Sequence, residues 1–153
     1  MNTTAHPRQR RPPPGVGPHE GQELDLMLAG TKPLALFSDA VEGAFWFPEA
    51  DFAPYVAAGR ILRFEDVTPP RADGHAIRRL FYCLPGEEWR VEAARALQDR
   101  LAHWDQPWTD EDDRAMGRLL GYREEDIEAF LAWFWRARRP VQRRRPPPGR
   151  GGA

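Results

Sequence analysis

The sequence predicts a small α+β domain, in which a three-stranded, mainly antiparallel sheet is covered by helices and followed by a C-terminal helical hairpin. Residues 61–67 and 76–84 are β-branched and aromatic runs, and the prolines and the Asp73-Gly74 pair between them favour a chain reversal. These runs predict an antiparallel hairpin. The chain after Gly86 instead repeats apolar residues at helical spacing. Because the strands come before most of the helices, we expect the helices to cover one face of the sheet.

The elements before the hairpin are shorter. Glu20 and Glu23 suit the positive end of a helix, and Gly30 suits its C-terminal cap. Pro33 then separates this helix from a short apolar run that is consistent with a buried strand. The predicted order is a helix over residues 19–29, a strand over 34–37, a loop over 38–47 that packs on the core, and one or two short helical turns over 48–59.

Three helices are predicted after the hairpin, each from an apolar stripe and from its ends. The first follows Gly86 and carries the most regular stripe. Thr109, with Asp112 three residues later, resembles a capping box that starts the second helix, and Gly121 ends it. The third opens with acidic residues at 124–126 and stops before Pro140. The stripes consist of Ala93, Ala94, Leu97, Leu101 and Trp104 in the first helix and of Ile127, Phe130, Leu131 and Phe134 in the last.

The net charge of −1 hides an uneven distribution along the chain. Residues 136–153 contain seven arginines and residues 1–17 contain three, and neither segment has a carboxylate. All 23 acidic residues therefore lie between them, against 12 of the 22 basic residues. We expect disordered Arg- and Pro-rich tails over residues 1–18 and 137–153, because they bury too little apolar surface to offset the entropy of ordering. A single acidic domain is expected over residues 19–136.

Composition restricts the class of protein. Cys83 is the single cysteine, so an intramolecular disulfide is impossible, and a reducing, cytoplasmic location is expected. No apolar stretch approaches the roughly 20 residues that span a bilayer, and prolines 12–14 interrupt any export signal. The chain has no phosphate loop and no dinucleotide fingerprint. We therefore expect neither a transmembrane segment nor a cofactor.

The leading functional hypothesis is a non-enzymatic binding or regulatory protein. An acidic, aromatic-rich surface would engage a partner protein, whose identity the sequence does not give. A contiguous exposed patch of tryptophans would favour this hypothesis, whereas buried tryptophans would simply belong to the core. The candidate contact residues are Trp46, Trp108, Trp133 and Trp135.

A second hypothesis is sequence-independent association with nucleic acid through the C-terminal tail. Arginines can neutralise phosphates without a folded framework, in which case binding weakens steeply with salt. The alternative is that the arginine-rich tail only keeps an acidic domain soluble. The candidate phosphate contacts are Arg138, Arg139, Arg143, Arg144 and Arg145.

A third hypothesis is a small enzyme of unknown class. Cys83 lies at the end of a predicted strand, with His75 or His103 as a candidate base, although a lone cysteine in an apolar strand is more often a small buried hydrophobe. His19 and Glu23 have the i, i+4 spacing of two ligands on one helix face. Two ligands are too few to define a metal site, so no metal is expected.

Overall fold

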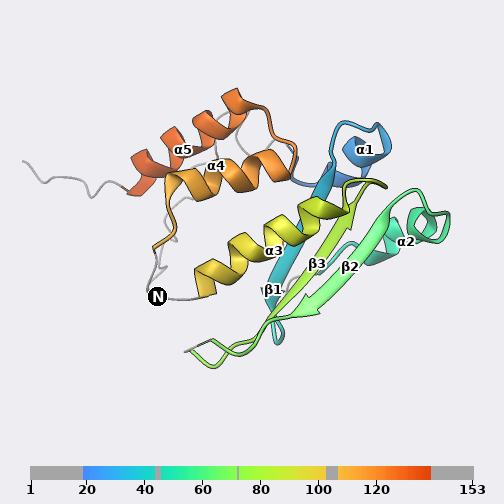
Figure 1. Ribbon diagram of the computed structural model, residues 1–153, viewed down its shortest axis with the longest axis horizontal. Coiled ribbons are helices and arrows are strands. Elements are labelled where there is room, and N and C mark those ends of the chain that lie inside the picture. The colour runs from blue at the N-terminus through green and yellow to red at the C-terminus, as the bar shows by residue number, and fades with distance from the viewer. Residues whose placement is uncertain (1–18, 44–45, 72, 103–106, 139–153) are drawn as a thin grey trace, which may run out of the picture.

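The computed structural model describes residues 19–43, 46–71, 73–102 and 107–138, which form five helices and three strands (Figure 1). The predicted α+β class is confirmed. The predicted N-terminal tail and all but two residues of the predicted C-terminal tail lie outside the described residues. In chain order the elements are α1 (Glu23–Leu28), β1 (Leu34–Ala40), α2 (Glu49–Ala57), β2 (Leu62–Val67), β3 (Ile77–Cys83), α3 (Glu88–Ala102), α4 (Asp110–Leu119) and α5 (Glu124–Arg138).

β3 is the central strand of the sheet, and both neighbours run antiparallel to it. Cys83 lies opposite Leu34 of β1 on one side and opposite Leu62 of β2 on the other. The predicted hairpin of β2 and β3 is therefore confirmed. β1 and β2 run parallel to each other on either side of β3, so the chain passes through α2 between them and the last strand inserts in the middle.

Helices cover both faces of the sheet, which corrects the expectation of one covered face. On one face Tyr82 of β3 packs with Phe52 of α2, and on the other Phe81 packs with Val91 of α3 and Leu119 of α4. Figure 1 shows α3 along one side of the sheet, with α4 and α5 stacked beyond it. We call these sides the α1–α2 face and the α3–α4 face. The prediction failed because β1 and the end of β3 are apolar at consecutive positions, and such strands are buried on both sides.

Several element boundaries differ from the predicted ones. α1 begins at Glu23, because residues 19–22 form a turn instead of the first turn of the helix. β1 continues to Ala40, where it still pairs with β3. The end of α5 at Arg138, by contrast, agrees with the prediction that this helix stops before Pro140. Helix α2 is a continuous element of nine residues within the segment predicted to hold one or two turns.

The start of α4 is the local prediction that the structure confirms in most detail. The Thr109 hydroxyl accepts a hydrogen bond from the Asp112 N–H, and the Asp112 carboxylate accepts one from the Thr109 N–H at 2.9 Å. Both partners of a capping box are therefore satisfied. The helix then ends before Gly121, whose φ of 82° is the left-handed conformation that glycine adopts without strain.

Adjacent arginines of β3 point to opposite faces of the sheet. Arg78, on the α1–α2 face, donates to Glu65 of β2 and to Glu49 of α2, each at 2.6 Å. Its guanidinium also lies 4.6 Å from the centre of the Phe47 ring. Both hydrogen bonds favour the ionised carboxylates, and they lower the pKa of Glu65 and of Glu49.

Arg79 is the corresponding residue of the α3–α4 face. It donates to Asp66 of β2 and to Asp99 of α3, each at 2.6 Å, and it is buried. Arg95 of α3 donates to the same Asp66 at 2.8 Å. Each face of the sheet therefore combines an apolar cluster with a network of arginines and carboxylates.

Candidate partner-binding groove

A groove of about 850 Å³ opens on the α1–α2 face, between α1, α2 and the segment that precedes α2. Its aromatic lining comes from Phe37 of β1, from Trp46, and from Phe52 and Tyr55 of α2. These residues belong to separate parts of the chain, and the insertion of β3 between β1 and β2 places them on one face. We call this cavity the α1–α2 groove.

The floor of the groove belongs to the core, whereas its rim is open. Phe52 is fully buried and stacks on Tyr82 with ring centres 4.0 Å apart, and Phe37 meets Phe52 edge-on at 6.0 Å. Trp46 has 69% of its surface exposed. A rigid aromatic floor beside a large exposed indole is typical of a surface that anchors a partner.

Two prolines shape the wall that α2 contributes. Pro48 precedes the first helical residue, where a missing N–H breaks no hydrogen bond. Pro54 lies inside the helix, and its ring provides no N–H to the carbonyl of Ala50 four residues earlier. Ala50 and Pro54 both line the groove. The Ala50 carbonyl is therefore an acceptor that lacks its usual donor within the helix.

The rim of the groove is acidic. Four carboxylates line it, and no arginine, lysine or histidine is found among the described residues of its lining. None of the four forms an ion pair with another described residue, although most carboxylates of β2, α3, α4 and α5 do. A basic partner would therefore meet carboxylates that no ion pair within the described residues engages. The four residues are Glu20, Glu23, Asp25 and Asp51.

Among the tryptophans proposed as contact residues, Trp46 and Trp108 lie in different parts of the fold. Trp46 lines the α1–α2 groove, whereas Trp108 is half-buried and its Nε1–H donates to Asp113 of α4 at 2.7 Å. This bond fixes the segment that enters α4. Trp133 is half-buried on α5, and the side chain of Trp135 lies outside the described residues.

An exposed tryptophan that the sequence did not single out lies on α3. Trp89 has 57% of its surface exposed, and the guanidinium of Arg90 lies 4.6 Å from its ring centre. It borders a second groove of about 850 Å³ between α3 and α4. There the cations are paired, Arg100 with Asp112 and Arg118 with a glutamate of α5. Trp89 is one turn before the predicted stripe, so its spacing resembles that of a core residue.

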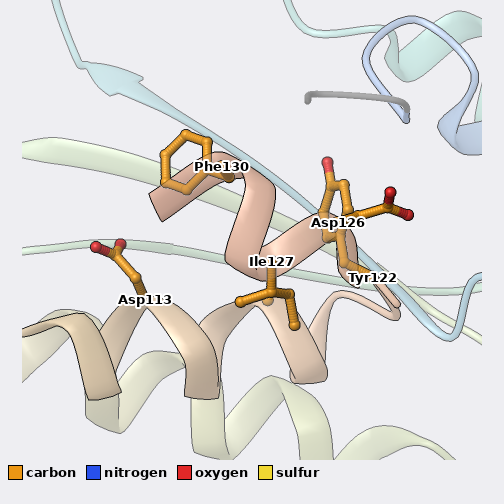
Figure 2. A pocket seen from close by; sticks show the side chains of 6 residues that line it. Asp113, Tyr122, Asp126, Ile127 and Phe130 are labelled. Carbon is orange, nitrogen blue, oxygen red and sulfur yellow. The ribbon is translucent and has the colours of Figure 1, made fainter. Parts of the chain in front are cut away.

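A smaller pocket of about 200 Å³ lies between α4 and α5 (Figure 2). Ile127 points from α5 toward α4 in this view, and Phe130 and Tyr122 line the same space. Asp113 at the α4 side already accepts from Trp108, and Asp126 accepts from Arg123. The volume is below the 300 Å³ or so that is typical of ligand pockets, so we interpret it as a gap in helix packing.

Lys32, the only lysine of the chain, is buried where the two faces of the fold meet. Its ammonium donates to the Leu120 carbonyl at the end of α4 at 2.8 Å and lies 2.9 Å from His19 Nδ1. The His19 ring stacks on Tyr122 at 3.9 Å. Burial lowers the pKa of Lys32 to about 8, and burial with the nearby ammonium lowers the pKa of His19 to about 4. Lys32 thus caps a helix terminus with its positive charge.

Of the residues proposed for nucleophilic catalysis, Cys83 and His75 are not brought together. Cys83 is completely buried, and burial raises the pKa of its thiol to about 11. His75 is exposed before the opposite end of β3, roughly 25 Å along an extended strand, where it faces Glu42. His103 lies outside the described residues. A thiol that is buried and protonated at neutral pH is not an activated nucleophile in this conformation.

The proposed pair of His19 and Glu23 is also not arranged as two ligands. His19 precedes α1 instead of lying in its first turn, so the helical i, i+4 relation does not apply. The Nδ1 atom of His19 already faces Lys32. Among the described residues, no group of three or more His, Cys, Asp or Glu side chains could hold a metal ion.

The arginines proposed to contact nucleic acid lie at or beyond the end of α5. Arg138 is the last residue of that helix, and its side chain is not among those described. The other four, Arg139, Arg143, Arg144 and Arg145, lie outside the described residues.

Comparison with known proteins adds no relative. No protein-family model matches the chain, and neither a curated protein sequence nor a solved structure matches it. Within the part of the chain that the structure describes, every helix is too short or too polar to cross a bilayer.

Proposed function

We propose that this protein is a non-enzymatic binding or regulatory protein, and that the α1–α2 groove is where it engages a basic segment of a partner protein. The observation that carries the proposal is the combination of the exposed Trp46 with four carboxylates that form no ion pair with another described residue. Aromatic anchors supply most of the affinity of such contacts, and charge complementarity supplies speed and selectivity of association.

The groove supports this function better than the other surfaces do. The groove between α3 and α4 also exposes a tryptophan, Trp89, but its charges are satisfied within the domain. The Cys83 region is closed to solvent. A partner at the α1–α2 groove would exchange water for arginine or lysine at each free carboxylate without breaking an internal ion pair.

Site-directed photocrosslinking tests the proposal in cells of the source organism. A photoreactive amino acid replaces Ala50, which lines the α1–α2 groove, and in a second strain it replaces Ala96, which lines the groove between α3 and α4. We expect a discrete crosslinked protein from position 50 and none from position 96. Trp46→Ala should weaken capture at least tenfold, as expected for a hot-spot residue, whereas Trp89→Ala should leave it unchanged.

Two results would count against this function. One is equal crosslinking from both positions, which indicates contact without a preferred surface. The other is capture that survives Trp46→Ala together with Asp51→Asn, since the groove would then contribute neither an anchor nor charge.

The second candidate function is association with nucleic acid through the C-terminal arginines. The observation in its favour is that residues 136–153 contain seven arginines and no carboxylate. The folded domain is a poor phosphate-binding surface, because the arginines of its strands and α4 are paired with carboxylates. Binding of a labelled oligonucleotide should then fall steeply between 50 and 200 mM salt. It should disappear after Arg143, Arg144 and Arg145 are replaced by glutamine. Salt-independent binding would exclude this function.

A further inference from the structure

The two ends of the chain carry the same short motif. Residues 9–15 read Gln-Arg-Arg-Pro-Pro-Pro-Gly, and residues 142–149 repeat this order with one additional arginine. Three successive prolines favour the polyproline II helix, which has three residues per turn and rises about 3.1 Å per residue. Three prolines in this conformation make a stiff apolar rod about 9 Å long, and in both motifs arginines immediately precede the prolines in the sequence.

The α1–α2 groove has the chemistry that recognises such a rod. Polyproline II segments dock in grooves lined by aromatic side chains, and Trp46, Tyr55 and Phe37 supply these. Flanking arginines require carboxylates or carbonyls as acceptors, and the lining includes Asp51 and also Ala50, whose carbonyl lacks its usual donor within the helix. The groove is about 850 Å³ in volume, which is ample for three prolines and the stem of an arginine.

We propose that the N-terminal motif, residues 9–15 of the same chain, occupies the α1–α2 groove, with the prolines against the aromatic side chains and the arginines on the acidic rim. This inference rests on the proposed function of the groove and names its resident ligand. An external basic partner then competes with the chain's own segment for the groove. Only a partner that binds tightly enough to displace this segment occupies the site.

The position of the N-terminal motif favours it over the C-terminal copy. Pro14 lies six residues before Glu20, which lines the groove, and six residues reach about 20 Å when extended. His19 is held by its stacking on Tyr122 and by Lys32, so the segment starts from a fixed point. A tether this short gives an effective concentration in the millimolar range. The C-terminal motif instead follows α5, which packs on α4 beyond the opposite face of the sheet (Figure 1).

Paramagnetic relaxation in the full chain tests the proposal. Cys83 is completely buried and its thiol pKa is about 11, so a thiol-reactive spin label at neutral pH modifies only an introduced cysteine. The label is attached at Gln9→Cys or, as the matched control, at Gln142→Cys. The signal that is followed is the indole N–H of Trp46, which is assigned through its loss in Trp46→Phe. We expect the Gln9 label to remove more than half of the Trp46 signal and the Gln142 label to leave it intact.

The outcomes separate the alternatives. Replacement of Pro12, Pro13 and Pro14 by serine should restore the Trp46 signal. Loss of signal from the Gln142 label, or no loss from either label, overturns the proposal. Loss that occurs between a labelled chain and an isotope-labelled second chain assigns the groove to another copy, and also overturns it.

A peptide provides the second measurement. A synthetic peptide of residues 7–17 should bind the full chain that carries the three serine substitutions at least about tenfold more tightly than it binds the unmodified chain, because the tethered segment no longer competes. Equal binding to both would contradict self-occupancy. If the relaxation experiment fails while photocrosslinking at position 50 still depends on Trp46, the groove keeps its proposed function and only the internal ligand is rejected.

Discussion

Both faces of the sheet carry an arginine that is paired with carboxylates, but the two arginines differ in burial. On the α3–α4 face Arg79 is inside the fold, with 7% of its side chain exposed, and its carboxylate partners come from β2 and α3. On the α1–α2 face Arg78 makes the same kind of bond with 28% of its side chain exposed. The first network includes Asp99 of α3, whereas the second includes Glu49 in the first turn of α2, whose side chain is 41% exposed.

This difference separates the structural half of the molecule from the half that we expect to bind. The described carboxylates that contact the sheet on the α3–α4 face are neutralised by arginines of the same face, so little charge is left for a partner. The α1–α2 face ends in the groove, where Asp25 and Asp51 have no cation among the described residues. Carboxylates that are paired with arginines of the same domain stabilise the fold. Carboxylates without an ion pair remain available to select a charged ligand.

The largest expected effect is the loss of the buried arginine. Arg79→Ala should lower the free energy of unfolding by about 3 kcal/mol, because it leaves Asp66 and Asp99 without their inner partner. The matched substitution Arg78→Ala on the other face should cost about 1 kcal/mol or less, since water screens that pair. Urea unfolding followed by circular dichroism measures both. Equal losses would show that the two networks contribute equally to stability, and would contradict the distinction between the two faces.

The next effect concerns Gly121, where the turn between α4 and α5 approaches the start of β1. A Cβ atom added at this position would lie 2.4 Å from Pro33 Cδ, and φ is 82°. Gly121→Ala should therefore cost about 2 kcal/mol or more, from backbone strain and displacement of Pro33. Gly59→Ala is the control, since φ is 71° there but nothing lies within 4 Å of the added carbon. It should show the strain alone, about 1 kcal/mol, in the same unfolding measurement.

A smaller effect is expected from protonation of His19, which lies beside Lys32. The pKa of His19 is about 4 in the folded protein, against 6.5 for an unperturbed histidine, so between these values the unfolded chain binds a proton that the folded protein does not. Stability should therefore fall as the pH is lowered from 6.5 to 4. The loss should be only roughly 1–2 kcal/mol, because the ring is partly exposed and water screens its interactions. The charged groups that face the ring are Lys32 and Asp126, and Glu23 acts on Lys32.

His19→Asn isolates this contribution, because its amide oxygen can accept from Lys32 but does not titrate. The stability difference between the two proteins should be constant above pH 6.5 and should change progressively below it. A pH-independent difference would show that burial and Lys32 do not lower the pKa of His19 in the folded protein.

The smallest effect is expected in the α1–α2 groove. Asp25→Asn combined with Asp51→Asn should change stability by less than about 0.5 kcal/mol, because neither carboxylate has an ion-pair partner among the described residues. Crosslinking from position 50 should nevertheless fall. Glu65→Gln, which removes a partner of Arg78 on the same face, should cost up to about 1 kcal/mol. A large loss of stability from the groove variant would assign these acids to the fold instead of to a ligand.

Local signals in the sequence were sufficient for most of the elements. The β2–β3 hairpin follows from two β-rich runs around a turn, and the start of α4 follows from Thr109 and Asp112 three residues apart. Both depend on neighbours in the chain. The start of α1 was misplaced because acidic residues at Glu20 and Glu23 suit a helix N-terminus equally well, and only the turn at residues 19–22 decides between them.

The candidate site could be anticipated only in part. The exposure of Trp46 agrees with its place in a segment of turn composition, and Trp46 was among the proposed contact residues. Trp108, another proposed contact residue, instead donates to Asp113 of α4. Nothing in the sequence places the acids of α1 beside the aromatic residues of α2, because these elements meet only once β1 and β2 flank β3.

The sequence by itself determined the order of the elements, the acidic character of the domain between two basic ends and the presence of a single cysteine. The tertiary structure decided that both faces of the sheet are covered and which carboxylates have partners. It also gave Lys32 its role, since the carbonyl that it caps belongs to a residue 88 positions away. Periodicity and capping act over a few residues, whereas burial and ion pairing depend on distances in space that only the folded chain defines.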